Sequence, residues 1–158
     1  MAINFNDSTR GHLLTLQDEL RAKSDRGNFS APENLHLTLT FLGECNDKQT
    51  TAAKSVLSDV RFAPFDITAL RVGRFKRDGG DIWWVGLREG KPLLALQRNL
   101  SDRLYTAGFA LESRKFSPHI TLGREVSTRV EPWWIETFGE MVNSIELMKS
   151  ERIGGKLT

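Results

Sequence analysis

The sequence predicts an α+β fold with a mostly antiparallel sheet, and three observations lead to this prediction. The chain has 158 residues, which suits one domain with one hydrophobic core. Its strand-like and helix-like segments follow an irregular order instead of the regular alternation that builds a parallel sheet. A short pattern also occurs twice, at residues 32–39 and 118–122, and it suggests two related halves within a single domain spanning residues 1–158.

The elements of the first half are predicted from hydrophobic periodicity and from residues that cap helices or form turns. Leucines recur at helical spacing after residue 7, where Asp7 or Ser8 supplies a helix cap. Gly27 and Pro32 favour a loop before a segment of strict apolar and polar alternation. The expected elements are a strand at 2–5, a helix at 7–23, a loop at 24–34, a strand at 35–43 and a helix at 47–60.

The second half is predicted in the same way. The glycines at 79–80 supply the turn of a hairpin, and a helix begins at Pro92 and ends before Gly108. The stretch 132–134 is expected to be a loop whose two tryptophans cover the core, and the glycines at 154–155 are expected to form a simple turn. The expected elements are strands at 65–77 and 82–87, a helix at 92–107, and strands at 119–122 and 141–149.

Composition narrows the class of protein. The 22 basic and 20 acidic residues leave a net charge of only +2, but residues 66–124 hold 11 basic and 6 acidic groups, a local excess of +5. This excess is a modest attraction for a polyanion and is also typical of a solvated surface. Cys45 is the one cysteine, so we expect no internal disulfide and a reducing compartment. No leader or membrane-spanning run is apparent, and we therefore expect a cytoplasmic protein away from membranes. We also expect a monomer.

Two of the three histidines lie in the same four-residue pattern of histidine, apolar residue, threonine and apolar residue. The pattern begins at His36 and again at His119. Because residues two apart on a strand point to the same face, His36 and Thr38 share one face, and His119 and Thr121 share another. A single histidine beside a threonine is ordinary sheet surface, but two such strands in equivalent halves predict a shared site.

Two imidazoles and two hydroxyls in one cleft suit hydrolysis of a phosphodiester without a metal. A neutral histidine can take a proton from the attacking water, and a protonated histidine can give one to the departing oxygen. Threonine hydroxyls can donate to the non-bridging phosphate oxygens as their charge grows. The sequence offers no histidine pair at helical spacing and no acidic cluster near either motif, so we expect neither a metal site nor a cofactor.

The two motifs resemble those of the 2H phosphoesterases. The segments that carry the resemblance are Pro32-Glu33-Asn34-Leu35-His36-Leu37-Thr38-Leu39-Thr40-Phe41-Leu42-Gly43-Glu44 and Ser117-Pro118-His119-Ile120-Thr121-Leu122-Gly123-Arg124. Within that superfamily the chain is most similar to the bacterial RNA 2′,3′-cyclic phosphodiesterases, also called 2′-5′ RNA ligases, over nearly its whole length. The family usually has a longer first strand and a final strand beyond the glycines near the carboxyl end.

The resemblance implies a bilobal fold, with two mostly antiparallel sheets flanked by helices around a central cleft of pseudo-twofold symmetry. It implies hydrolysis of a terminal 2′,3′-cyclic phosphate to a 2′-phosphate, with ATP-independent ligation as the reverse step. His36 would be the proton donor and His119 the proton acceptor. Thr38, Thr121 and Arg124 would bind phosphate, although strand alternation turns Arg124 away from His119 unless Gly123 interrupts the strand.

Other residues are weaker candidates for binding RNA. Arg74 and Lys76 belong to the densest basic run, which could line an RNA path or be an ordinary exposed hairpin. Trp83 and Trp84 are adjacent on a strand, so one is expected in the core and the other, taken as Trp83, could stack on a base. Two alternatives stay open: a non-catalytic module that binds RNA ends or nucleotides, and the same chemistry on another cyclic or 2′-5′ linked nucleotide.

Overall fold

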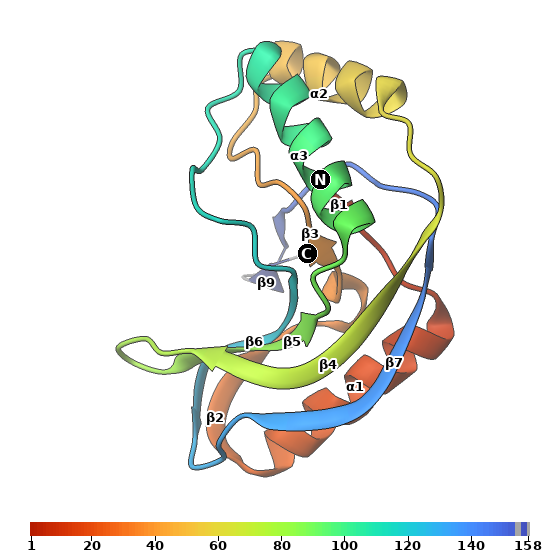
Figure 1. Cartoon of the computed structure of the whole chain (residues 1–158). Helices are drawn as coiled ribbons and strands as arrows, with labels where there is room; N and C mark the ends of the chain where they lie inside the picture. The colour runs from red at the N-terminus through yellow and green to blue at the C-terminus, as the bar shows by residue number, and fades with distance from the viewer. Residues whose placement is uncertain (154–155, 158) are drawn as a thin grey trace.

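The computed structural model describes residues 1–153, 156 and 157, and it has the predicted α+β architecture. Three helices accompany an antiparallel sheet whose strand order is β1-β3-β6-β5-β4-β7, with β2 paired to the far end of β6 (Figure 1). The helices are α1 (Asp7–Ala22), α2 (Asp47–Asp59) and α3 (Lys91–Thr106). The sheet strands are β1 (Ala2–Ile3), β2 (Ser24–Phe29), β3 (Leu37–Thr38), β4 (Phe65–Phe75), β5 (Asp81–Leu87), β6 (His119–Thr128) and β7 (Trp133–Val142). A short turn of 3₁₀ helix covers Pro32–Asn34, and β8 (Arg152–Ile153) pairs with β9 (Lys156–Leu157).

All three helices begin and end close to where the sequence predicts them. Asn6, one residue before the expected cap, accepts a hydrogen bond from Thr9 N–H and starts α1. Asn46 and Gln49 form a reciprocal capping box at the start of α2. Gly108 follows α3 with φ +96°, a conformation that favours glycine and ends the helix. No helix in residues 1–153 is long and apolar enough to cross a bilayer.

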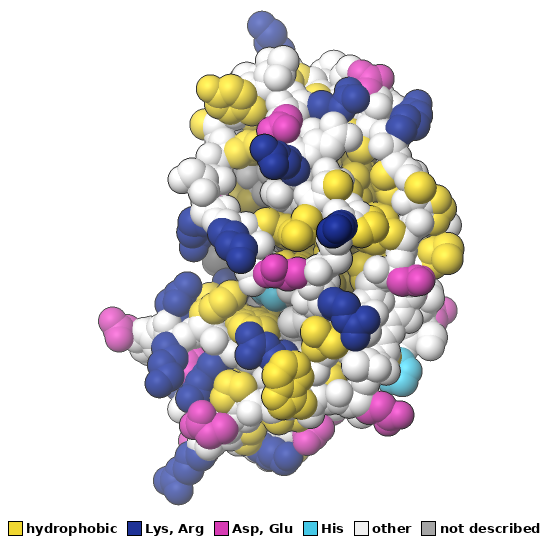
Figure 2. Space-filling view, viewed as in Figure 1, with side chains coloured by type: hydrophobic (Ala, Val, Ile, Leu, Met, Phe, Trp, Pro, Cys, Tyr) yellow, Lys and Arg dark blue, Asp and Glu magenta, His cyan; other side chains and the backbone are white. Residues whose placement is uncertain are grey.

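The two motif strands lie in one continuous sheet, whereas the resemblance implied two separate sheets. Strand β3 pairs directly with β6 through Leu37 and Ile120. In Figure 1, α2 and α3 lie at one end of the molecule, and α1 packs against the curved sheet at the other. Figure 2 shows a hollow across the middle of this face, between the two ends. The bilobal shape therefore comes from strong curvature and from helices at opposite ends.

Three strand assignments from the sequence are wrong. Residues 24–29 form β2, although Gly27 and Pro32 favoured a loop, because the long strand β6 offers them hydrogen-bonding partners. The expected strand at 35–43 shortens to β3 at its centre. The expected loop at 132–134 begins strand β7, which pairs with β4 and ends at Val142. The expected strand at 141–149 therefore contributes its first two residues to β7, and Glu146 forms an isolated bridge with Ala2. The turn expected at 154–155 lies outside the described residues.

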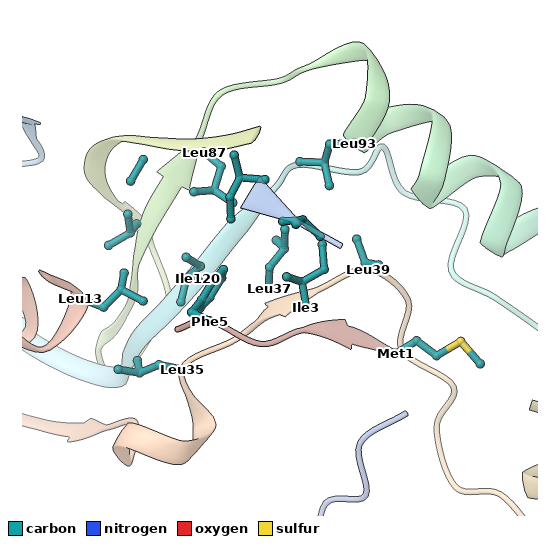
Figure 3. Close-up of a cluster of buried hydrophobic side chains, with 14 of the residues drawn as sticks. Met1, Ile3, Phe5, Leu13, Leu35, Leu37, Leu39, Leu87, Leu93 and Ile120 are labelled. Atoms are coloured by element: carbon teal, nitrogen blue, oxygen red, sulfur yellow. The ribbon is translucent and has the colours of Figure 1, made fainter. Parts of the chain in front are cut away.

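The core separates the motif strands into a buried and a functional face. Leu37 and Ile120 are fully buried and, with Ile3 and Leu39, point into one hydrophobic cluster (Figure 3). This cluster anchors the back of the β1, β3 and β6 strands, so that alternate side chains must point the other way. Phe41 continues the apolar alternation of Leu37 and Leu39 in the sequence, but it is 70% exposed because β3 ends before it.

Candidate active site

The register of β3 and β6 brings the two motifs together. Leu37 is paired with Ile120 in an antiparallel ladder. One step along each strand then sets His36 opposite Thr121 and Thr38 opposite His119. Directly opposed residues on antiparallel strands share a face, with β-carbons about 4.5–5.5 Å apart. The two histidines form a diagonal pair, roughly 7–8 Å apart at this spacing.

All four side chains are at least partly accessible to solvent, as a binding site requires. Thr38 is exposed, while His36, His119 and Thr121 are half-buried. Figure 2 shows histidine surface at the bottom of the central hollow, next to a hydrophobic patch and several lysine and arginine side chains. A separate shallow pocket of about 330 Å³ lies on β4 and β7 around Asp66 and Glu140, and none of its lining residues is a histidine. The histidines and threonines of the two motifs therefore lie in the open hollow and not in this pocket.

His119 is fixed by one hydrogen bond and two aromatic rings. Its Nδ1 lies 2.7 Å from the carbonyl oxygen of Ser117, so this nitrogen carries the proton and donates it to the carbonyl. The His119 and Phe75 rings are perpendicular, with 5.3 Å between their centroids, and the centroid of Trp84 lies 6.2 Å from that of His119. In the neutral ring this arrangement leaves the lone pair on Nε2, which can accept a proton.

His36 is held differently, and its pKa lies below the ordinary value of 6.5. Burial is the largest cause, the positive amino terminus of Met1 adds to it, and the backbone of Asn34 partly offsets it. The Nδ1 atom itself is buried without a hydrogen bond of normal geometry. In each motif the carbonyl two residues before the histidine acts on the histidine ring. The Ser117 carbonyl holds His119 more firmly than the Asn34 carbonyl holds His36.

Trp84, rather than Trp83, is the tryptophan that reaches the site. Its indole ring covers two glycines: a β-carbon placed on Gly73 would come within 2.7 Å of Trp84 Cζ3, and one on Gly86 within 2.9 Å. Trp84 is 7% exposed and its Nε1 has no hydrogen-bond partner among the described residues. The Trp84 ring therefore packs directly on the backbone of these two glycines, next to His119.

The prediction that Trp83 stacks on a base is wrong. Trp83 is completely buried and packs against Trp133 at 6.1 Å. Alternation shows that only one of the adjacent tryptophans faces the site, but it does not show which one. The pairing of Trp84 with Thr121 decides this, and the glycines at positions 73 and 86 are the only local sign of it in the sequence.

Arg74 makes its contacts within the protein, which argues against the predicted role in RNA binding. It is paired with Trp83 in the ladder, lies over that ring at 5.6 Å and keeps only 15% of its side chain exposed. Its guanidinium forms ion pairs with Asp81 at 3.6 Å and Glu131 at 3.0 Å. Arg74 therefore ties the hairpin to the start of β7, while Lys76 is exposed near the hairpin tip and its role in RNA binding stays a prediction.

Arg124 lies beyond an irregularity in β6 that changes the direction of its side chain. Thr121 is paired with Trp84 and Gly123 with Trp83, so two steps along β6 match one step along β5. Such a bulge reverses the alternation of the strand. Gly123 therefore shares the buried side of Trp83, and Arg124 turns to the exposed side that His119 occupies. The contact of Arg124 with phosphate stays a prediction.

A buried glutamine stabilises this bulge from behind. Gln17 of α1 is 2% exposed, and its side-chain N–H groups donate to the carbonyls of Leu122 at 2.9 Å and Ser30 at 2.8 Å. The backbone N–H of Ser30 donates to the same Leu122 carbonyl at 2.9 Å. A buried amide with two bonds to irregular backbone is costly to remove. The sequence gives no signal for this role, since Gln17 reads as an ordinary helical residue.

Residues 1–153, 156 and 157 contain no group of three or more histidine, cysteine, aspartate or glutamate side chains arranged to hold a metal ion. The polar side chains that converge on the hollow are instead the imidazoles and hydroxyls described above, with Arg124 nearby. This set can transfer protons and donate hydrogen bonds to an anion.

Comparison with known proteins agrees with the geometry. The family model described as LigT-like phosphoesterase matches twice, over residues 3–84 and 85–153. A protein of Archaeoglobus fulgidus named RNA 2′,3′-cyclic phosphodiesterase is 34% identical over 148 residues, which cover 89% of this chain and 83% of the relative. The crystal structure of TT0787 from Thermus thermophilus has the same fold, with a TM-score of 0.86 at 24% identity over 99% of this chain and 90% of that one. The structure of Escherichia coli LigT complexed with 3′-AMP gives a TM-score of 0.80 at 24% identity over the same shares of the two chains. The chain therefore belongs to the LigT-like phosphoesterase family of 2H enzymes.

Proposed function

We propose that this protein hydrolyses the 2′,3′-cyclic phosphate at the end of an RNA to a 2′-phosphomonoester, by acid and base catalysis from two histidines. The observation that carries the proposal is the pairing of Leu37 with Ile120. It places two imidazoles and two hydroxyls on one face of the sheet, with each threonine opposite a histidine. The family and the name of its Archaeoglobus relative support the substrate class.

His119 acts as the proton acceptor in this proposal. Its Nδ1 proton is committed to the Ser117 carbonyl, so Nε2 can take a proton from water as the water oxygen attacks phosphorus. His36 donates its proton to the 3′ oxygen as the bond from that oxygen to phosphorus breaks. The product carries a 2′-phosphate and a 3′-hydroxyl, and the two histidines have exchanged protonation states. Solvent restores them.

Thr38, Thr121 and Arg124 stabilise the phosphate in this scheme. Each threonine lies directly opposite a histidine, so its hydroxyl can donate to a non-bridging oxygen whose negative charge grows in the transition state. Arg124 adds a positive charge on the same side of β6. None of these steps requires a metal ion or another cofactor.

In a related reaction, a 5′-hydroxyl would replace water as the nucleophile and join two RNA ends by a 2′-5′ linkage without ATP. The two histidines would keep their roles, because the 5′-hydroxyl gives its proton to His119 and the departing 3′ oxygen takes one from His36. Because water is in large excess, hydrolysis is favoured over this ligation. A non-catalytic RNA-end module would have no need of two imidazoles that are both accessible and diagonal to each other.

The test measures turnover of an oligonucleotide with a 2′,3′-cyclic end in the presence of EDTA. We expect the native protein to release a 2′-phosphate, identified by ³¹P NMR. His36→Ala and His119→Ala should each lose about 10²–10⁴-fold in kcat/KM, the usual contribution of a general acid or base. His12→Ala, which alters the exposed histidine of α1, is the matched control and should keep full activity.

Two results would contradict the proposal. Turnover close to the native rate in either histidine variant would remove the assigned roles, and loss of native activity in EDTA would remove the metal-independent mechanism. Binding of the cyclic end with no product from the native protein would instead establish the non-catalytic module. Thermal unfolding of each variant shows whether a loss reflects the site or the fold.

A further inference from the structure

We propose that Arg71 and Trp134 bind the nucleotides that precede the cyclic end, so that the enzyme prefers an oligonucleotide to a nucleoside cyclic phosphate. This inference rests on the proposed function and identifies the length of substrate that the site takes. Neither residue belongs to the two histidine motifs.

The pairing registers place these residues in one row across four strands. His119 of β6 is paired with Gly86 of β5, Gly86 with Arg71 of β4, and Arg71 with Trp134 of β7. Paired residues share a face of the sheet, so Arg71 and Trp134 lie on the same face as His119. Gly86 has no side chain, and the ring of Trp84 covers it between His119 and Arg71.

The side chains of the row confirm the register. The Arg71 guanidinium lies 5.1 Å from the centre of the Trp84 ring and 5.9 Å from that of Trp134. Trp84 in turn packs against Phe75 at 5.2 Å, and both rings flank His119. A chain of aromatic and cationic contacts therefore links the proposed proton acceptor to the edge strand β7.

Exposure and charge distinguish this surface from ordinary packing. Trp134 is 75% exposed, the most exposed of the four tryptophans, although burial of so large an apolar ring would be favourable. Arg71 is exposed as well, and among residues 1–153 no carboxylate forms an ion pair with it. Arg74, three residues along the same strand, has two carboxylate partners. The positive charge of Arg71 is thus available to an anion.

The reach of the row suits a short single strand. Trp134 is three strand spacings from His119, about 14 Å at the usual spacing between strands. This distance corresponds to roughly four nucleotides at the stacked rise of about 3.4 Å, and to fewer when the strand is extended. An exposed indole can stack on any base, and a guanidinium can bind the phosphate between two nucleotides. We therefore expect recognition of length with little dependence on base identity.

The test compares kcat/KM for 2′,3′-cyclic substrates from one to six nucleotides long. We expect kcat/KM of the native protein to rise over the first few nucleotides and then level off. Trp134→Ala should lower kcat/KM for the longer substrates by about 5–150-fold, the range for loss of one stacked base, and leave the mononucleotide unchanged. Trp134→Phe should keep most of the rise in kcat/KM with substrate length. Tyr105→Ala, which removes an equally exposed aromatic ring from α3, is the matched control and should behave like the native protein.

A binding experiment tests Arg71 without relying on turnover. In the inactive His119→Ala background, Arg71→Met should reduce affinity for a six-nucleotide cyclic-ended strand and lower the slope of log affinity against log salt by about one. An unchanged slope would contradict the phosphate contact. Equal turnover of all lengths by the native protein would overturn this inference while leaving the proposed function intact. An equal loss for the mononucleotide and the hexanucleotide in Trp134→Ala would also overturn it, because it would indicate a structural role. Failure to hydrolyse any of these substrates would instead refute the proposed function and this inference with it.

Discussion

At the scale of single residues, the two histidines of the site differ in their surroundings. His119 donates from Nδ1 to a carbonyl and rests against two aromatic rings, whereas His36 is half-buried, lies within the electrostatic influence of the amino terminus and has a weaker backbone partner. Burial and the nearby positive charge both favour the neutral form of His36. A proton donor must be protonated, so the free protein holds His36 in the less useful state, and the anionic substrate has to compensate.

This conflict predicts the pH dependence of the reaction. In the free enzyme the pKa of His36 lies below 6.5, so kcat/KM should already decline with rising pH below that value. The negative charge of a bound phosphate favours the imidazolium, so the alkaline limb of kcat should lie at higher pH than that of kcat/KM. Steady-state kinetics from pH 5 to 9 will check this. An alkaline limb of kcat/KM well above pH 7 would show that His36 is not the donor.

Much of the site could be predicted at the residue scale. The two histidines and two threonines repeat one pattern, and strand alternation alone places the histidine and threonine of each motif on one face. Trp83 was chosen over Trp84 because alternation separates the two without orienting them. The bulge that turns Arg124 towards the site depends on the pairing of β6 with β5 and on Gln17, far away in the sequence. Such information is absent from any local pattern.

At the scale of elements, the hairpin of β4 and β5 supports His119 through Trp84. The ring needs the space above Gly73 and Gly86, since a β-carbon at either position would overlap it. An aromatic ring wedged on strand backbone cannot yield as a flexible chain would. The two glycines are therefore a packing requirement of the site, although in the sequence they merely weaken a predicted strand.

Gly73→Ala tests this support. The added methyl should displace the Trp84 ring, destabilise the protein by about 1–3 kcal/mol as overpacking usually does, and lower kcat by misplacing His119. Gly11→Ala is the matched control: its β-carbon meets nothing within 4 Å, and alanine within a helix is favourable by about 0.5–1 kcal/mol over glycine. Urea unfolding and steady-state kinetics measure both effects. Normal kcat in Gly73→Ala would show that Trp84 does not position the histidine.

The helices and the central hairpin were predicted closely because each carries its own periodicity, cap or turn residues. The segments predicted wrongly depend on partners. Strand β2 has poor strand residues and exists because β6 extends beyond the motif to meet it, and β7 exists because β4 is long enough to pair with Trp133 onwards. Strand β3 is shorter than its pattern because only its centre finds hydrogen-bonding neighbours on both sides.

At the scale of the whole molecule, the site lies between the end that carries α2 and α3 and the end that carries α1. The amino terminus of Met1 is buried there, and its nitrogen donates to the Thr40 carbonyl at 2.6 Å. Burial lowers the pKa of this amine from 8.0 to about 6, an effect that the thiol of Cys45 partly opposes. The neutral forms of this amine and of His36 are thus both favoured by folding.

Stability should therefore increase with pH between about 6 and 8. In this range the unfolded chain binds more protons than the folded one, so the free energy of unfolding rises with pH, by at most about 3 kcal/mol from the amine. The gain is complete above pH 8 and is lost as the pH falls through about 6. Urea midpoints at pH 5.5, 6.5, 7.5 and 8.5 measure it, and His36→Asn should flatten the lower part of the curve. A urea midpoint that decreases as the pH is raised from 6 to 8 would contradict the prediction.

The pairing of Leu37 with Ile120 has a consequence for ancestry. Each of these residues lies midway between the histidine and the threonine of its own motif, so a local dyad passes between them and exchanges the two strands. A peptide bearing a single copy of the motif, aligned head to tail against an identical partner, would generate the same quartet of side chains. A homodimer of half-length chains would therefore already contain a complete site, and fusion of duplicated genes would then have freed each histidine to specialise as acid or base.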